Sequence, residues 1–308
     1  MTSRSVAVLA VLLAARSVHA QEPLGDLAGR LSAMTAPVGY ESAMADTLLG
    51  LVGGARDRAG NVVLAARGTG RRRLVACPMD EPGWIVGGVR DDGYLTVRRL
   101  PGRMPPFFDQ HLEGHRIVVW GRRGAVPGVV AVRSTHLTRG RTVDEAPFTS
   151  DQAFIDVGAA AADEVRALGI GVLAPVAREK VPHRYGRSLL AAPAAGRRAA
   201  CAALIRAARS RTDRVAVAFV VEQDLAARGL LTVINESGPF DDVVLLDGGG
   251  AAAPVTAATD SIARGEGVVR LHRWTLRTRF AGTPVETVDL DDAAELERRL
   301  VAWMREGR

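Results

Sequence analysis

The stretch Leu74-Val75-Ala76-Cys77-Pro78-Met79-Asp80-Glu81-Pro82-Gly83-Trp84-Ile85-Val86 decides how the fold of this chain is read. A short apolar run, preceded by arginines, ends at Pro78 and is followed by the carboxylates of Asp80 and Glu81. This pattern is typical of a buried strand that delivers two carboxylates to a sheet edge. Because sites in α/β sheets form at the carboxyl ends of strands, the stretch predicts where a site lies.

Segments on both sides of this stretch carry the periodicity of an α/β layer. Helices are predicted over residues 23–34, 42–52, 160–168, 196–209 and 291–305, and further strands over 215–221, 243–246 and 274–280. Asp57-Arg58-Ala59-Gly60-Asn61 is expected to form a tight turn between two short strands, since Gly and Asn tolerate positive φ. Residues 181–195 are expected to be irregular.

From Trp84 onwards the pattern changes to short strands separated by Gly- and Asp-containing turns. Strands are predicted over residues 85–89, 94–98, 116–120, 126–132 and 154–157, with an exposed polar loop over 138–150. Several short strands in succession favour a small barrel. The predicted fold is therefore α/β: one α/β domain formed by residues 21–83 and 176–308, interrupted by a β-barrel inserted over residues 84–175.

Residues 1–20 have the pattern of a secretory signal peptide. Arg4 supplies a positive start, residues 6–15 form an apolar run, and Val18-His19-Ala20 fits a cleavage site before Gln21. The run is too short to span a bilayer, and no later stretch is long enough. We therefore expect an exported protein, secreted or periplasmic, with no membrane span.

The amino-acid composition argues against a nucleic-acid-binding protein. The formal charge is +6 over 308 residues, but only 5% of the residues are aromatic, so few rings accompany the arginines and nucleic-acid binding is not expected.

Cys77 and Cys201 make no metal motif. An exported protein could pair them, but one ends a strand and the other lies in a helical pattern, so two buried free thiols are predicted. No Gly-x-Ser-x-Gly or His-Glu-x-x-His motif supports a serine hydrolase or a single-zinc protease.

Several short motifs, taken in order, resemble one known family. The matching stretches are Ala36-Pro37-Val38-Gly39-Tyr40-Glu41, Asp57 to Asn61, Met79-Asp80-Glu81-Pro82-Gly83, Gly128-Val129-Val130-Ala131-Val132 running to His136, Ile155-Asp156-Val157-Gly158-Ala159, and Thr283-Pro284-Val285-Glu286-Thr287-Val288-Asp289-Leu290. Each is weak alone, but together they cover nearly the whole mature chain. They resemble the glutamyl and deblocking aminopeptidases with two co-catalytic metals, the tetrahedral-assembly type of peptidase family M42. The resemblance implies a phosphorylase/hydrolase-like, three-layer αβα peptidase domain with an inserted small barrel.

The resemblance also implies a site with two divalent metals, zinc or cobalt, held by His, Asp, Glu, Asp and His, with a glutamate as general base. The first histidine position is occupied here by Pro78, and the last by Gly282. The bridging aspartate position aligns with Ala192, in a stretch from 181 to 211 that contains no acid. Three ligand positions therefore lack a donor side chain.

The remaining positions keep part of the family pattern. Asp80, which in the family orients the first histidine, is present. Counting back from Arg228-Gly229 places Gln223 at the general-base position and Asp224 at the glutamate ligand. A neutral amide cannot take a proton from water, and aspartate is one methylene shorter than glutamate. Asp247 ends its strand as the fourth ligand does.

These departures predict an inactive homologue of metal-dependent aminopeptidases, with Asp224 and Asp247 as vestigial ligands. No cofactor is expected, or at most one weakly bound divalent metal. For Asp80 and Glu81, an inherited structural role in the turn is favoured over a residual catalytic one. Two alternatives stay open: an active metallohydrolase with an altered metal site built on Asp80, Glu81, Asp224 and Asp247, and a structural partner of an active paralogue. A peptide, a paralogue or further copies of the chain are the candidate partners.

Overall fold

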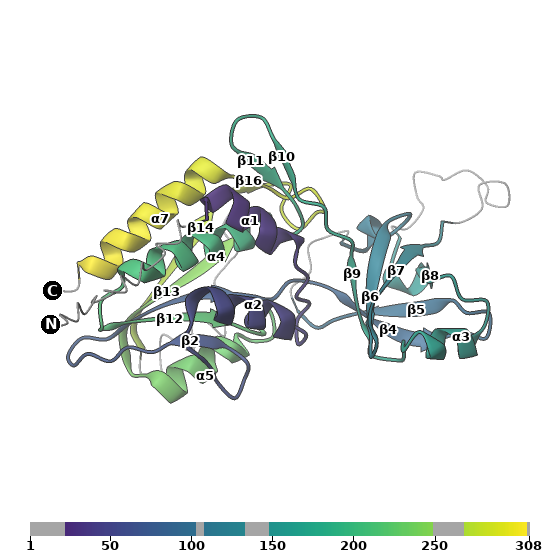
Figure 1. Ribbon diagram of the computed structural model, residues 1–308, viewed down its shortest axis with the longest axis horizontal. Coiled ribbons are helices and arrows are strands. Elements are labelled where there is room, and N and C mark those ends of the chain that lie inside the picture. The colour runs from purple at the N-terminus through teal and green to yellow at the C-terminus, as the bar shows by residue number, and fades with distance from the viewer. Residues whose placement is uncertain (1–21, 103–107, 133–147, 249–267, 307–308) are drawn as a thin grey trace, which may run out of the picture.

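The structure is a computed structural model, and it describes residues 22–102, 108–132, 148–248 and 268–306 (Figure 1). The predicted signal peptide lies outside these residues, as do His136 and most of the predicted 138–150 loop. Among the described residues, no helix is both long enough and apolar enough to cross a membrane.

A six-stranded sheet forms the centre of the larger domain, in the order β1-β2-β12-β3-β13-β14. The strands β12, β3, β13 and β14 run parallel, whereas β2 pairs antiparallel with β12 and with β1. Their bounds are β1 Ala55–Arg56, β2 Val62–Leu64, β3 Arg73–Pro78, β12 Val215–Val220, β13 Phe240–Gly248 and β14 Val268–Leu276.

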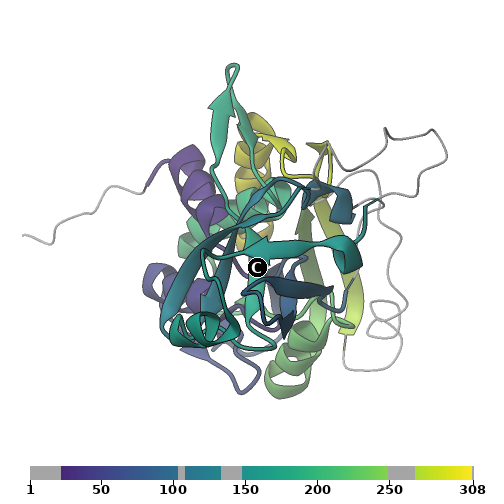
Figure 2. The same cartoon turned by 90° about the vertical axis from the view of Figure 1, so that its right-hand side faces the viewer.

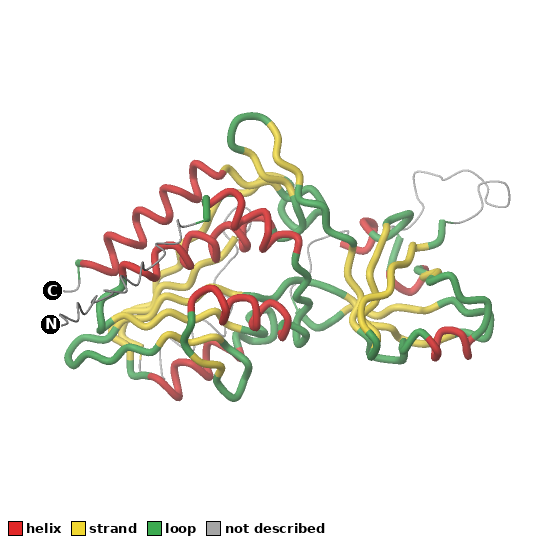
Figure 3. Tube along the Cα trace, in the orientation of Figure 1, coloured by secondary structure: helices red, strands yellow, loops and turns green. Residues whose placement is uncertain are grey.

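Both faces of this sheet are buried, which explains the continuous apolar runs of its central strands. In β3, Val75 and Cys77 face one cluster of apolar side chains, while Leu74 and Ala76 face another. The first face is covered by α1 (Leu24–Ala33), α2 (Ser42–Val52), α4 (Ala195–Ala207) and α7 (Leu290–Arg305), and the second by α5 (Arg228–Ser237). Figure 3 shows the resulting layers of helix, strand and helix.

The smaller domain is a closed barrel of six strands, in the order β4-β5-β8-β7-β6-β9. It faces the viewer in Figure 2. Its elements are β4 Trp84–Val89, β5 Leu95–Arg99, η1 Phe108–His111, β6 Arg116–Gly121, β7 Gly124–Val130, η2 Ser150–Gln152, β8 Phe154–Asp156, α3 Ala162–Ala167 and β9 Pro175–Arg178. The predicted α/β fold with a small inserted barrel is confirmed, and the last barrel strand is β9, Pro175–Arg178.

A small antiparallel sheet, in the order β10-β11-β16-β15, lies beside the first layer of helices. Its strands are β10 His183–Tyr185, β11 Leu189–Ala191, β15 Thr278–Arg279 and β16 Thr287–Asp289. The prediction of an irregular segment over residues 181–195 is therefore wrong in part, because β10 and β11 form a hairpin whose second strand pairs with β16. The helix α5 was not predicted.

Candidate active site

The carboxyl ends of β3, β12 and β13 bring together three aspartates that are far apart in the sequence. Asp80 follows β3, Asp224 lies in the loop after β12, and Asp247 is the second-last residue of β13. These strands are parallel neighbours, so their ends meet at one edge of the sheet. The backbone N–H of Asp224 donates to Oδ2 of Asp80 at 2.8 Å, which links two of the three directly.

The Asp57–Asn61 turn positions the loop that carries Asp224. Oδ1 of Asp57 accepts the backbone N–H groups of Ala59, Gly60 and Asn61, so the predicted tight turn is confirmed. The Asn61 side chain then reaches the loop: its Oδ1 accepts the N–H of Val221 at 2.9 Å and its Nδ2 donates to the carbonyl of Gly229 at 3.0 Å. Asn61 thus holds both ends of the segment that contains Gln223 and Asp224.

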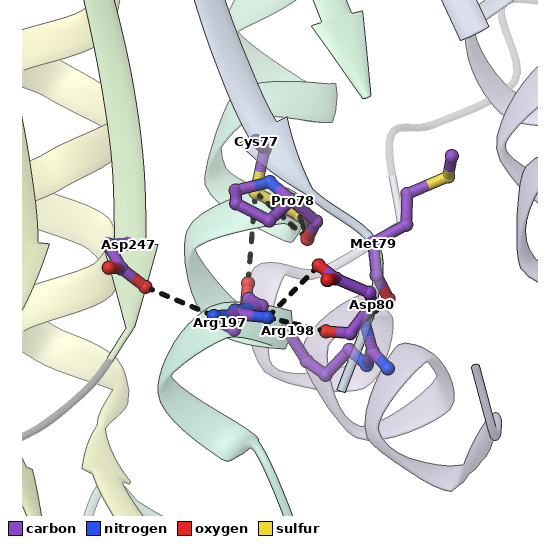
Figure 4. Close-up of a disulfide and its surroundings, with 8 residues drawn as sticks. Cys77, Pro78, Met79, Asp80, Arg197, Arg198 and Asp247 are labelled. Carbon is purple, nitrogen blue, oxygen red and sulfur yellow. Dashed lines mark hydrogen bonds and ion pairs between the residues drawn. A yellow bond between two sulfur atoms is a disulfide. The ribbon is translucent and has the colours of Figure 1, made fainter. Parts of the chain in front are cut away.

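The guanidinium of Arg197, in the first turn of α4, lies among the three aspartates. Figure 4 shows it between Asp80 and Asp247. Nη1 is 3.1 Å from Oδ1 of Asp80, and Nη2 is 3.2 Å from Oδ1 of Asp224 and 3.5 Å from Oδ1 of Asp247. Nη1 also donates to the backbone carbonyl of Asp80 at 2.7 Å. The Arg197 side chain is only 11% exposed and that of Asp80 is 0% exposed, so these charges interact with little water between them.

The pKa values of Arg197 and Asp80 depend on their burial and on the three aspartates that surround one arginine. Burial alone would lower the pKa of Arg197, but the charges of Asp224, Asp80 and Asp247 raise it well above its ordinary value. Arg197 is therefore a permanent cation. Burial raises the pKa of Asp80 to about 7, and the negative charge of Asp224 adds to that effect, while Arg197 opposes it.

Asp80 should make the stability of the protein depend on pH. Its pKa is about 7 in the folded chain against an ordinary value of 3.8, so the folded state binds more protons between these two pH values. The free energy of unfolding should then fall as pH rises from about 4 to about 7. In Asp80→Asn this fall should be smaller, measured by urea denaturation across that range. Asp163→Asn, on an exposed side chain, is the control, and parallel curves for Asp80→Asn and wild type would contradict the assignment.

Three of the predicted ligand positions have no side-chain donor, and Glu286 connects two of them. Its Oε1 accepts the N–H of Gly196 and its Oε2 accepts the N–H of Gly282, each at 2.9 Å. The backbone carbonyl of Glu286 accepts the N–H of Ala192 at 2.9 Å. Gly282 and Ala192 therefore both lie at the start of α4, close to Arg197. Pro78 ends β3, two residues before Asp80.

Gln223, at the predicted general-base position, lies next to Asp224 in the loop after β12. Its amide oxygen is buried and has no hydrogen-bond partner among the described residues. The preceding residue, Glu222, adopts a positive φ of 51°, which shows that the loop is held in a conformation that non-glycine residues seldom adopt. A carboxamide here has no titratable oxygen with which to remove a proton from water.

The residues around Arg197 do not fit the two-metal centre that the family resemblance implies. Such a centre needs three or four protein ligands for each ion, whereas Pro78, Ala192 and Gly282 supply none. Within the described ranges, no three or more His, Cys, Asp or Glu side chains are grouped so that they could hold a metal ion. The three aspartates that do converge are already paired with the charge of Arg197.

Glu81 has a different environment, at the junction between the two domains. Its Oε2 pairs with Lys180, just after β9, and with Nη2 of Arg198 at 2.9 Å, while its Oε1 accepts the N–H of Ala36 at 3.0 Å. Burial alone would raise the pKa of Glu81, but the charges of Lys180 and Arg198 lower it. Burial also lowers the pKa of Lys180 to about 8. Both carboxylate oxygens of Glu81 therefore make contacts within the protein, which indicates a structural role.

Cys77 and Cys201 form a disulfide, so the prediction of two free thiols is wrong. Their Cα atoms lie 5.6 Å apart because α4 packs directly on β3, a proximity that two residues separated by 124 positions do not reveal in the sequence. Cys201 lies one helical turn after Arg197, and Sγ of Cys77 is 3.9 Å from the carbonyl oxygen of Arg197 (Figure 4). The disulfide therefore fastens the turn that carries Arg197 to the strand that leads to Asp80.

Arg197 was not singled out from the sequence, although a signal was present. Gly196-Arg197-Arg198 begins a predicted helix in a stretch with no acidic residue. A cation in the first turn of a helix is unfavourable beside the helix dipole. Two arginines at such a position indicate that acids from elsewhere in the fold must surround them.

Comparison with known proteins places this geometry in context. The family model described as M42 glutamyl aminopeptidase matches residues 60–273. The chain is 28% identical over 215 residues to SgcX of Escherichia coli (strain K12), covering 65% of this chain and 56% of that protein. It is 29% identical over 181 residues to the lysyl aminopeptidase of Pyrococcus furiosus, covering 56% and 50%. The matched region thus spans about half the length of these curated relatives.

Solved structures share the fold at low sequence identity. The aminopeptidase APDkam598 from the archaeon Desulfurococcus kamchatkensis superposes with a TM-score of 0.77 at 21% identity, over 92% of this chain and 95% of that one. The Pyrococcus horikoshii TET1 peptidase, which can assemble into a tetrahedron or a large octahedral shell, gives a TM-score of 0.78 at 18% identity, over 92% and 100%. These similarities establish the fold.

Proposed function

The chain belongs to the M42 glutamyl aminopeptidase family, and we propose that it is an exported, non-catalytic member that binds a peptide or a partner subunit. The observation that carries this proposal is Arg197, whose guanidinium lies among Asp80, Asp224 and Asp247 where the strands of the sheet end. The replacement of ligand positions by Pro78, Ala192 and Gly282, and of the base by Gln223, supports it. A metal-activated water would lack the ligand set that binds its ion, and it would lack a carboxylate at the general-base position.

Export is supported by two independent features. The first is the signal pattern of residues 1–20, and the second is the Cys77–Cys201 disulfide, because disulfides persist in oxidising compartments and are rare in the cytosol. N-terminal sequencing of the mature protein should find Gln21 as its first residue. An uncleaved chain that remains in the cytosol would contradict this part of the proposal.

A metal and activity assay tests the loss of catalysis. The oxidised, full-length protein is incubated with zinc or cobalt, its metal content is measured, and release of amino acids from glutamyl- and lysyl-linked chromogenic substrates is followed. We expect neither stoichiometric metal nor metal-dependent turnover, because the donors required for both are absent at three positions. An M42 enzyme with its ligands intact, assayed in parallel, is the positive control.

The same experiment separates the alternatives. Bound metal together with metal-dependent turnover would favour an active hydrolase with an altered site built on Asp80, Glu81, Asp224 and Asp247. A stable mixed complex with an active M42 paralogue, seen by size-exclusion chromatography with mass measurement, would favour a structural subunit. Because a relative of this fold assembles into closed shells, we propose that this chain also self-associates, and a monomeric mass would contradict that.

A further inference from the structure

We propose that Arg197 is a built-in cation that takes the place of metal ions at this site, and that Asp80, Asp224 and Asp247 become a divalent-cation site once the charge of Arg197 is removed. The inference rests on the proposed loss of catalysis, since a chain that held two metals would have no room for this guanidinium. It names Arg197, a residue outside the predicted ligand positions, as one cause of that loss.

The pairing geometry supports this exchange of one cation for another. The Asp224 carboxylate spans both ends of the guanidinium, with Oδ2 3.3 Å from Nη1 and Oδ1 3.2 Å from Nη2. Asp80 lies beside Nη1 and Asp247 beside Nη2. One carboxylate therefore spans the two terminal nitrogens of the guanidinium, and each nitrogen has a second carboxylate beside it. The planar fork of arginine suits this two-point arrangement, which a lysine ammonium would not reproduce.

Charge balance explains why a cation is required at this position. Carboxylates that are largely removed from water need a counter-charge in contact with them. Arg197 meets all three aspartates, and Nη1 of Arg273 lies 3.4 Å from Oδ2 of Asp247. A variant without the Arg197 charge removes the counter-charge that the three acids share, while Arg273 still pairs with Asp247. Around the guanidinium, the described His, Cys, Asp and Glu side chains are not grouped so that they could hold a metal ion. Once the guanidinium is gone, the three carboxylates offer a hard, oxygen-only donor set, which favours Mn²⁺, Mg²⁺ or Ca²⁺ over softer ions.

The backbone of Arg197 cannot retreat to make room for an ion in the wild-type protein. A methyl group built on Gly248 would lie only 1.8 Å from the backbone nitrogen of Arg197, so the end of β13 is already in close contact with the start of α4. On the other side, the Cys77–Cys201 disulfide holds the next turn of α4 against β3. The backbone that carries Arg197 is thus held between two fixed points, which keeps the start of its side chain close to the end of β13 and to β3.

Titration with Mn²⁺ tests the proposal, because the paramagnetism of free Mn²⁺ allows bound ion to be counted directly. Wild type and Arg197→Met, which keeps an unbranched side chain without the charge, are titrated in parallel. We expect Arg197→Met to bind one Mn²⁺ with a dissociation constant at least tenfold below that of wild type. Adding Asp224→Asn to that variant should abolish the gain. Arg187→Met, on a side chain that is 92% exposed, is the matched control and should behave as wild type.

A second measurement uses small cations in solution. Methylguanidinium at low millimolar concentration should raise the thermal midpoint of Arg197→Ala more than that of wild type, because it can restore the missing planar cation, whereas methylammonium should do so less. Equal shifts for both proteins would overturn the proposal. If Arg197→Met does not fold, Arg197→Met combined with Asp224→Asn and Asp247→Asn must fold, since the unbalanced acids are then gone. Failure of that variant would also overturn it.

The outcomes distinguish this inference from the proposed function. Metal-dependent turnover by the wild-type protein would refute the proposed loss of catalysis and the inference with it. A wild-type protein that is inactive and metal-free, together with an Arg197→Met variant that folds but binds no Mn²⁺, would refute the inference alone.

Discussion

Loss of the Cys77–Cys201 disulfide is expected to lower the free energy of unfolding by about 2–5 kcal/mol. The bond closes a loop with a sequence separation of 124 residues, which includes the whole inserted barrel. In the chain-entropy model a loop of about 100 residues contributes about 4.7 kcal/mol. The same bond also ties α4 to β3, so its removal frees the elements that hold Arg197 and Asp80 together.

Urea denaturation of the oxidised protein, the reduced protein and the Cys77→Ala/Cys201→Ala variant measures this effect. Both treatments should lower the midpoint, and the reducing agent should have no effect on the double variant, which serves as its control. A reduced wild-type protein that unfolds at the same urea concentration as the oxidised one would show that the disulfide does not contribute to stability.

Glu81→Gln is expected to cost about 3–5 kcal/mol, the range found when one partner of a buried ion pair is removed. The side chains of Lys180 and Arg198 are 3% and 1% exposed, so neither can recover its lost partner from water. The glutamine has nearly the same shape but presents either a neutral oxygen or an N–H donor to two cations. Because Lys180 follows the barrel and Glu81 precedes it, the substitution should also loosen the junction between the domains.

The pH dependence of this penalty follows from the lowered pKa of Glu81. A carboxyl whose folded pKa is below its ordinary value of 4.5 contributes stability that is fully present above that value and is lost as pH falls through the folded pKa. The difference between wild type and Glu81→Gln should therefore be constant near neutral pH and shrink below about pH 4.5. Glu179→Gln, in an exposed pair with Arg116, is the control, and an equal effect of both variants would contradict the assignment.

The fold could be predicted from the sequence where burial leaves a periodic pattern. The runs at Leu74–Cys77 and Val215–Val220 are buried on both faces, and the barrel strands are separated by regular turns. The β10–β11 hairpin was missed because its first strand is exposed and its strands are three residues long, so its conformation depends on pairing with β16. The helix α5 was missed because Arg228-Gly229, with which it begins, was used only to align Gln223 and Asp224 with the family pattern.

The site was predictable in part for a related reason. Asp80, Asp224 and Asp247 follow strands, and parallel strands deliver their carboxyl ends to one edge, so sequence reasoning could expect them to converge. The partner that neutralises them comes from a helix on a different layer, and nothing local in Gly196-Arg197-Arg198 states which acids it meets. The pairing of Cys77 with Cys201 depends on the same contact between α4 and β3.

The tight approach of Gly248 to Arg197 has a consequence for the order in which substitutions could rebuild an enzyme on this scaffold. Pro78→His and Gly282→His would each place an imidazole near a guanidinium that already satisfies the aspartates, so neither change alone brings any gain in metal affinity. The arginine has to leave first, and that step removes the counter-charge shared by Asp80, Asp224 and Asp247 before any ion is bound. The first substitution towards catalysis would therefore lower the stability of the protein. This makes the present state difficult to reverse by single mutations.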